Sequence, residues 1–119
     1  MTNDSRSFRL AKKFMGQVVT VTVDRPLGSK HPKWGFEYPV NYGFLKGIIA
    51  PDGEELDAYV LKIKEPIKEF TGVIVAIVHR TEDDDDKLVV TPQNITITNE
   101  EIEAQIEFQE KFFKHVITR

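Results

Sequence analysis

Short apolar and β-branched segments, separated by turns rich in proline, glycine and acidic residues, make up most of the chain as far as Pro92. Alternating or continuous apolar residues over such lengths are typical of β-strands. They predict strands at residues 18–23, 42–49, 56–63, 72–79 and 87–91. Residues 72–79 are nearly all apolar, so this strand is expected to be central and buried on both faces.

Beyond Pro92 the pattern changes to that of an amphipathic helix. Thr98 and Glu101 have the spacing of a capping box, in which each side chain bonds the other residue's backbone amide. The apolar residues that follow recur at helical spacing on one face: Ile102, Ile106, Phe113 and Val116, widened by Phe108 and Phe112. We therefore predict a helix that reaches from residue 98 to residue 117, and an irregular arm over residues 1–16.

Several short strands followed by one helix predict a mainly β fold with α, of the α+β class. The expected architecture is a small closed or partly open β-barrel, similar to an OB-fold, with the C-terminal amphipathic helix packed on it. A length of 119 residues without a visible interdomain linker predicts a single domain over residues 1–119.

Composition narrows the class of protein. Forty per cent hydrophobic and 29% charged residues are ordinary for a soluble globular chain. No apolar run approaches about 18 residues, so no membrane span is expected, and residues 1–6 lack the features of a secretory signal. The absence of cysteine excludes disulfides and thiolate metal sites and fits a cytoplasmic protein. A net charge of −3 gives no basic surface for nucleic acid, while a homo-oligomer is compatible with the sequence.

The stretch Asp52-Gly53-Glu54-Glu55-Leu56-Asp57 places four carboxylates at a turn and the start of a strand. Crowded carboxylates repel one another, and a hard divalent cation relieves that repulsion by taking oxygen ligands from several of them. Strand alternation puts Asp57 on the face opposite Leu56. An ordinary solvated turn accounts for the same residues, since Asp is common in turns.

Two further groups of residues are explained either as part of a binding site or as ordinary surface. The run from Asp83 to Asp86 is either a charged hairpin loop or a source of metal ligands. A set of cationic and hydroxyl side chains could hold phosphate oxygens, although each of them alone is equally an ordinary surface residue. This set comprises Arg25, Lys30, His31, Lys33, Tyr42 and Lys87.

Three motifs in the same order resemble the family I soluble inorganic pyrophosphatases. The family signature of spaced aspartates is matched at residues 52–58, with Glu54 in place of an aspartate. The Tyr-Pro-x-x-Tyr-Gly segment that precedes it in the family stands at residues 38–43. An acidic loop that ends in Asp-x-Lys before an apolar strand and a proline stands at residues 85–92.

The resemblance implies Mg²⁺-dependent hydrolysis of pyrophosphate, with several Mg²⁺ ions or Mn²⁺ and a metal-activated hydroxide that attacks one phosphorus in line. It further implies four metal ligands: Asp52, Asp57, Asp83 and Asp85, with Glu82 a rival to Asp83. Glu54 would be the general base, and Tyr42 and Lys87 would contact phosphate. Of the upstream cations, one alignment assigns phosphate binding to Arg25 and another assigns it to Lys33.

Two departures from the family leave other functions open. The helix that ends in Phe112-Phe113-Lys114-His115 continues with Val116, where the family has a phosphate-binding Tyr-Lys pair. The chain is also shorter than is usual for the family. A non-catalytic phosphate or nucleotide binder and a metal-dependent hydrolase of another diphosphate, such as a nucleotide, are therefore alternatives.

Overall fold

The computed structural model describes residues 5–119. Its elements are α1 (Arg6–Lys12), β1 (Val18–Arg25), β2 (Asn41–Ile49), β3 (Glu55–Val60), β4 (Glu69–Arg80), β5 (Lys87–Thr91), α2 (Asn99–Glu110) and β6 (His115–Thr118). Each of the five predicted strands is present, and the last of them has the predicted bounds. No helix within residues 5–119 is long and apolar enough to cross a membrane.

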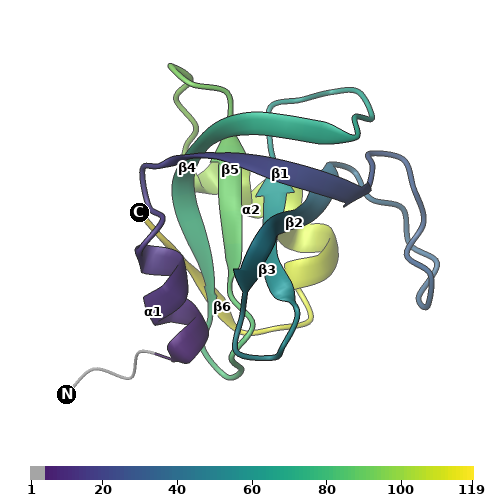
Figure 1. Cartoon of the computed structure of the whole chain (residues 1–119). Coiled ribbons are helices and arrows are strands. Elements are labelled where there is room, and N and C mark those ends of the chain that lie inside the picture. Colours follow the sequence, from purple (N-terminus) through teal and green to yellow (C-terminus); the bar gives the residue numbers. More distant parts are fainter. Residues whose placement is uncertain (1–4) are drawn as a thin grey trace.

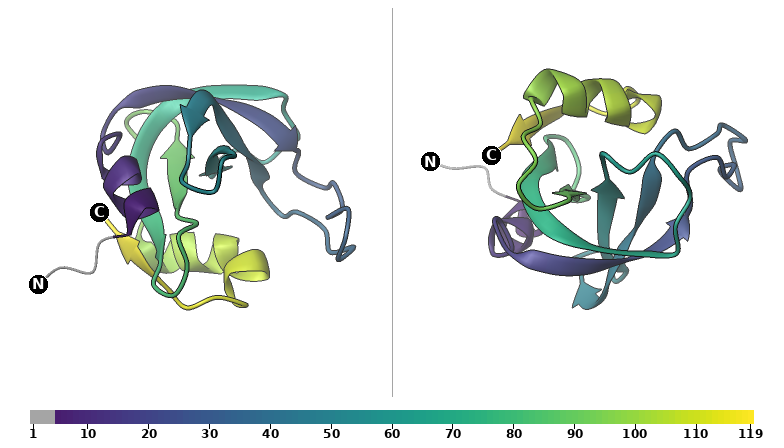
Figure 2. Two further views of the ribbon diagram at one scale, coloured as in Figure 1. Left: turned by 60° about the horizontal axis from the view of Figure 1, so that its bottom comes forward. Right: turned by 90° about the horizontal axis from the view of Figure 1, so that it is seen from above.

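Five strands close into a barrel, as predicted (Figure 1). The strand order is β1-β2-β3-β5-β4-β6, and an additional pairing of β1 with β4 closes the ring and leaves β6 outside it. β3 and β5 run parallel, whereas the other pairs are antiparallel. Figure 2 (right) shows the ring of strands from above, with α2 outside it.

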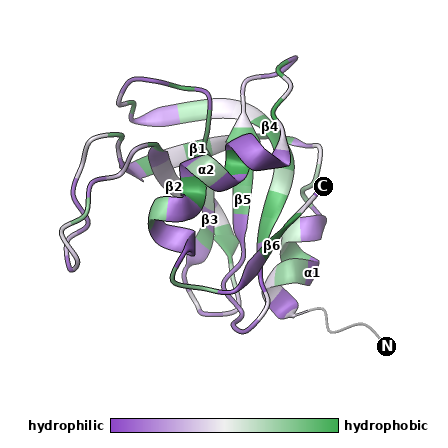
Figure 3. Ribbon diagram, turned by 180° about the vertical axis from the view of Figure 1, so that it is seen from behind, coloured by the Kyte–Doolittle hydropathy of each residue, from purple (hydrophilic) through white to green (hydrophobic). Residues whose placement is uncertain are grey.

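Strand alternation gives the barrel two apolar clusters. Leu56, Ala58 and Val60 of β3 belong to the first cluster, in the barrel interior. Tyr59 points the other way, into a second cluster that lies under α2 together with Ile102 and Ile106. Figure 3 shows α2 across this outer face, above strands coloured as hydrophobic. Both faces of the wall are therefore covered at this point, which explains the near-continuous apolar pattern of β4.

The predicted helix over residues 98–117 is too long. The capping box of Thr98 and Glu101 is confirmed, but α2 ends at Glu110 and the chain turns back into β6. β-branched Val116 and Ile117 favour a strand, and they pair with β4 in register opposite His79 and Val78. β6 therefore pairs with the edge of β4, a pairing that the helical spacing of the apolar residues did not predict.

The predicted irregular arm is also partly wrong. Residues 1–4 lie outside the described residues, but Ser5 caps α1 by accepting a hydrogen bond from the Phe8 amide at 3.2 Å. Ala11 of this helix is fully buried in the interior cluster, with Phe8 packed against the same cluster. A short helix of mixed polarity is stabilised here by packing, which local sequence patterns do not report.

Candidate active site

Asp57, Asp85 and Lys87 form a compact ionic group on the outer wall of the barrel. The Lys87 Nζ lies 2.6 Å from Asp57 Oδ2 and 2.8 Å from Asp85 Oδ1. Asp57 faces outward because its neighbours Leu56 and Ala58 face the interior. The Lys87 side chain is only 4% exposed, whereas each carboxylate is about one-third exposed. A buried ammonium is thus neutralised by two carboxylates that solvent can still reach.

Tyr42 lies beside this group, with its ring centroid 6.0 Å from the Lys87 Nζ. Burial, followed by the negative charge of Asp57, raises the pKa of the Tyr42 phenol well above its ordinary value. The phenol therefore stays protonated at neutral pH. Its single O–H has the Asp57 carboxylate as an acceptor and would donate to a bound anion by exchanging that partner.

The four consecutive aspartates between β4 and β5 point in two directions. Asp83 and Asp85 face Arg80, with carboxylate oxygens 3.8 and 3.3 Å from its Nη1. Asp84 instead accepts a hydrogen bond from the backbone of α1 at 2.7 Å, and buried Asp86 accepts one from the Arg80 amide at 3.0 Å. The loop therefore offers two carboxylates to the site and uses the other two to hold its own position.

Arg80 is a second buried cation, which the sequence patterns did not single out. Its Nε and Nη2 each lie 2.9 Å from a carboxylate oxygen of fully buried Glu110. Burial acts to raise the pKa of Glu110, but the hydrogen bonds and charge of Arg80 outweigh it and hold that pKa below its usual range. The Tyr59 hydroxyl also donates to Glu110, at 2.6 Å. This network joins the end of β4 to the end of α2 through the wall of the site.

Two sequence signals could have revealed that network. Arg80 ends β4, two residues after the apolar run that closes with Val78. Glu110 continues the four-residue spacing of Ile102 and Ile106, so a carboxylate falls on the apolar stripe of the helix. A charged residue at the end of each of two buried patterns indicates a buried ion pair, because a charge is rarely buried without a partner.

Asp52 and Glu54 lie in the exposed turn between β2 and β3. The Asp52 carboxylate accepts a hydrogen bond from the Glu54 amide at 2.9 Å, which is the ordinary Asp chemistry of a turn. Within residues 5–119, neither side chain contacts the group around Lys87. The structure therefore brings together only part of the predicted site.

Neither Arg25 nor Lys33 is ion-paired with this group in the described part of the chain, although Arg25 stands opposite Tyr42 in the pairing of β1 with β2. Arg25 ends β1, and its Nη1 is 3.9 Å from the carboxylate of Asp24. Lys33 lies on the loop between β1 and β2, with its ammonium 4.8 Å from the centroid of the Trp34 ring. Neither residue lines the pocket that opens beside this group.

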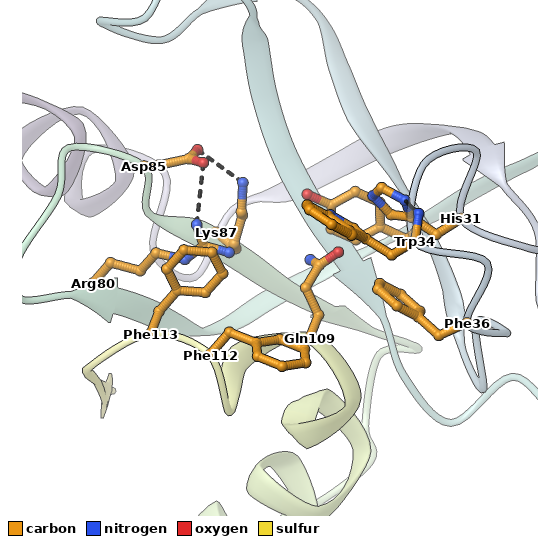
Figure 4. Close-up of a pocket in the computed structure, with 10 residues that line it drawn as sticks. His31, Trp34, Phe36, Arg80, Asp85, Lys87, Gln109, Phe112 and Phe113 are labelled. Atoms are coloured by element: carbon orange, nitrogen blue, oxygen red, sulfur yellow. Dashed lines mark hydrogen bonds and ion pairs between the residues drawn. The ribbon is translucent and has the colours of Figure 1, made fainter.

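A pocket of about 640 Å³ opens beside the ionic group. Arg80, Asp85 and Lys87 lie together at one end, and His31, Trp34 and Phe36 lie at the other (Figure 4). The remaining lining residues are Tyr42, Gln109, Phe112 and Phe113. The pocket thus combines a charged end with an aromatic end.

The chemistry and charge of the donors fit a divalent cation. Four carboxylates pair with the two cations Arg80 and Lys87, which leaves an excess of two negative charges. These carboxylates are Asp57, Asp83, Asp85 and Glu110. Carboxylate oxygens are the ligands that Mg²⁺ prefers. Residues 5–119 contain no preformed cluster of three or more metal-binding side chains. A cation that bound here would have to compete with the ion pairs that Lys87 and Arg80 make with these carboxylates.

The family model described as inorganic pyrophosphatase matches residues 12–118. Solved inorganic pyrophosphatases with a similar fold come from Helicobacter pylori (16% identity, 86% of this chain and 84% of that chain, TM-score 0.66) and Ehrlichia chaffeensis (16%, 85% and 84%, 0.66). A third comes from Neisseria gonorrhoeae (24%, 82% and 71%, 0.62). None of the curated proteins matches the chain at a significant level. The predicted family is confirmed: the chain belongs to the inorganic pyrophosphatases, a family of hydrolases that act on a phosphoric anhydride.

Proposed function

We propose that the chain hydrolyses inorganic pyrophosphate to two phosphates, with Mg²⁺ as its cofactor, in the pocket beside Lys87. The observation that carries this proposal is the arrangement around that ammonium, where Asp57 and Asp85 converge next to the protonated phenol of Tyr42. Hydrolysis of a phosphoric anhydride needs both ligands for cations and donors for phosphate oxygens on one surface. This surface supplies both.

The unused donors of the two buried cations define where phosphate would bind. Lys87 carries three N–H donors, of which two go to Asp57 and Asp85, so one is left for a phosphate oxygen. Arg80 has five N–H donors, and three are engaged with Glu110 and Asp85. The remaining donors are fixed by these ion pairs before substrate arrives, which is the property that electrostatic catalysis requires.

Asp57, Asp83 and Asp85 are the residues that would hold cations, joined by Asp52 from the neighbouring turn. When bound, divalent cations supply activation of water and neutralisation of phosphate charge. Glu54 would accept the proton of the attacking water, for which its turn has to approach the pocket. The excess negative charge around Arg80 and Lys87 repels a polyanion, so we expect phosphate binding to depend on cations.

Purified protein is expected to release phosphate from pyrophosphate in the presence of Mg²⁺ or Mn²⁺, and a chelator should abolish that release. The measurement is a phosphate-release assay with and without the cation, beside an established pyrophosphatase as a positive control. Absence of release at protein concentrations where the positive control turns over would contradict the proposed activity.

Glu54→Gln is expected to lower the rate of hydrolysis by about a hundredfold or more, as is typical for loss of a general base. Cation and phosphate affinities should change little, because the residue acts mainly in the transition state. Glu54→Asp moves the carboxylate back by one methylene and should also change the rate. Glu69→Gln, another exposed glutamate, at the start of β4, serves as the matched control. Unchanged rates in both Glu54 variants would assign this residue to the turn surface.

A further inference from the structure

The aromatic end of the pocket has no counterpart in the chemistry of pyrophosphate. Trp34 is 68% exposed and Phe112 is 66% exposed, and these are the highest exposures among the large hydrophobic residues of the described chain. Both line the same pocket as Lys87. Large aromatic groups left open to solvent beside a charged site are a mark of ligand binding. Pyrophosphate carries only charged oxygens, so it gives these rings nothing to contact.

The loop that carries Trp34 is held by hydrogen bonds. The His31 ring accepts hydrogen bonds at Nδ1 from the backbone amides of Lys33 at 3.1 Å and Trp34 at 3.0 Å. The His31 amide donates to the Phe36 carbonyl at 2.8 Å, and the His31 ring packs on that of Phe36 with centroids 4.8 Å apart. The exposed position of Trp34 is therefore set by an ordered loop.

The opposite wall is formed where α2 ends. One face of the Phe113 ring is already covered, because it packs on the guanidinium of Arg80 at 3.8 Å. Phe112 contacts the ammonium of Lys111 at 5.3 Å and leaves most of its ring exposed. Gln109 lies between the charged and aromatic ends (Figure 4). Its amide nitrogen donates to Tyr59 at 2.7 Å, which leaves a second N–H for a polar group of a ligand.

We propose that this pocket binds a diphosphate esterified to a planar aromatic group, that is, a ligand of the nucleoside diphosphate class. The phosphates would lie at Lys87 and Arg80, and the planar base would stack on Trp34 and Phe112. A volume of about 640 Å³ is within the range of pockets that enclose ligands of this size. The placement of the phosphates rests on the proposed function, whereas that of the base rests on the aromatic wall.

Calorimetry with excess Mg²⁺ can test the proposal with three ligands that hydrolysis cannot consume at the bridge. They are methylenediphosphonate, its adenosine ester and its cyclohexyl ester. The two esters carry the same charge, and only the adenosine ester, which also has a ribose, carries an aromatic ring. We expect the adenosine ester to bind roughly tenfold more tightly than either of the others, as stacking on an aromatic side chain provides. It should also quench the fluorescence of Trp34, the single tryptophan of the chain.

Trp34→Ala and Phe112→Ala should each weaken binding of the adenosine ester by roughly fivefold or more. Ile49→Ala is the matched control, because this side chain is similarly exposed, at 57%, and does not line the pocket. The control should leave the affinity unchanged. Equal affinity for the two esters, or an adenosine ester whose affinity neither aromatic variant lowers, would overturn the proposal.

The two proposals fail in different ways. Phosphate release from pyrophosphate without preference for the adenosine ester would leave the proposed function standing and remove the aromatic ligand. Tight, Trp34-dependent binding of the adenosine ester without phosphate release from pyrophosphate would support the aromatic ligand and contradict the proposed hydrolysis. In that case the chain would be a nucleotide binder that retains the fold of the hydrolases.

Discussion

Lys87→Met is expected to lower the rate of pyrophosphate hydrolysis by roughly a hundredfold to a thousandfold, the range seen when one preorganised donor is removed. The same substitution should raise the affinity for divalent cations. Lys87 now neutralises Asp57 and Asp85, from which its Nζ lies 2.6 and 2.8 Å. Without the ammonium, Asp57 loses this partner and Asp85 keeps only Arg80, at 3.3 Å, so both carboxylates bind a cation more readily and their mutual repulsion favours binding. Steady-state rates at saturating Mg²⁺ and cation titration by calorimetry measure the two effects.

Asp57→Asn is expected to change the affinity for divalent cations in the opposite direction to Lys87→Met. It removes one negative charge from the proposed cation site, so cation affinity and rate should both fall, whereas Lys87→Met should lower the rate and raise the affinity. Lys62→Met is the matched control, because Lys62 pairs with Glu101 at 2.7 Å in a more exposed setting. Breaking such a surface pair costs about 1 kcal/mol or less and should leave the rate unchanged. A fall in cation affinity in Lys87→Met would show that this residue organises the site and does not compete with cations.

The strands of the barrel could be predicted from local sequence patterns, because alternation and turn residues act over a few neighbouring positions. Asp57 illustrates this, since its outward direction follows from the burial of Leu56 and Ala58 on either side. The same reasoning could not place Glu54 relative to Lys87. That relation depends on how the turn between β2 and β3 lies over the barrel, which no spacing within the turn encodes.

The elements that sequence patterns misassigned are those decided by distant partners. Val116 continues the apolar helical stripe of Phe113, yet it lies in a strand because β4 offers an unpaired edge. α1 forms because Ala11 is buried against the barrel and Asp84 bonds its backbone at 2.7 Å. The ion pair of Arg80 was not predicted for the same reason, because its partner Glu110 lies 30 residues away along the chain.

Arg80→Met is expected to reduce the free energy of unfolding by about 3–5 kcal/mol, the cost of leaving a buried charge without its partner. Glu110 is fully buried, and two of its contacts are the Arg80 Nε and Nη2 at 2.9 Å. Once Arg80 is removed, the Tyr59 hydroxyl is the remaining donor to that carboxylate. Denaturant unfolding at neutral pH measures the loss. Lys62→Met, which breaks the more exposed pair with Glu101 at 2.7 Å, is the matched control and should cost about 1 kcal/mol or less.

Replacing both members of the pair should restore most of that stability. In the double variant Arg80→Met with Glu110→Leu, two apolar side chains fill the space and no buried charge is left unpaired. The Tyr59 hydroxyl loses an acceptor, so a residual cost of about 1–2 kcal/mol is expected. A double variant as unstable as Arg80→Met alone would show that the hydrogen bonds of the pair, and not an unpaired charge, account for the loss.

The pH dependence of unfolding follows from the direction of the pKa shift. Because Arg80 holds the pKa of Glu110 below that of the unfolded chain, the pair stabilises the fold fully above the unfolded value. This contribution is lost as the pH falls through the folded pKa, since the carboxylate is then protonated. The wild-type protein should therefore lose stability on acidification, and the double variant should lose less over the same pH interval. Parallel curves for the two proteins would mean that the acid sensitivity arises from other carboxylates, such as those around Lys87.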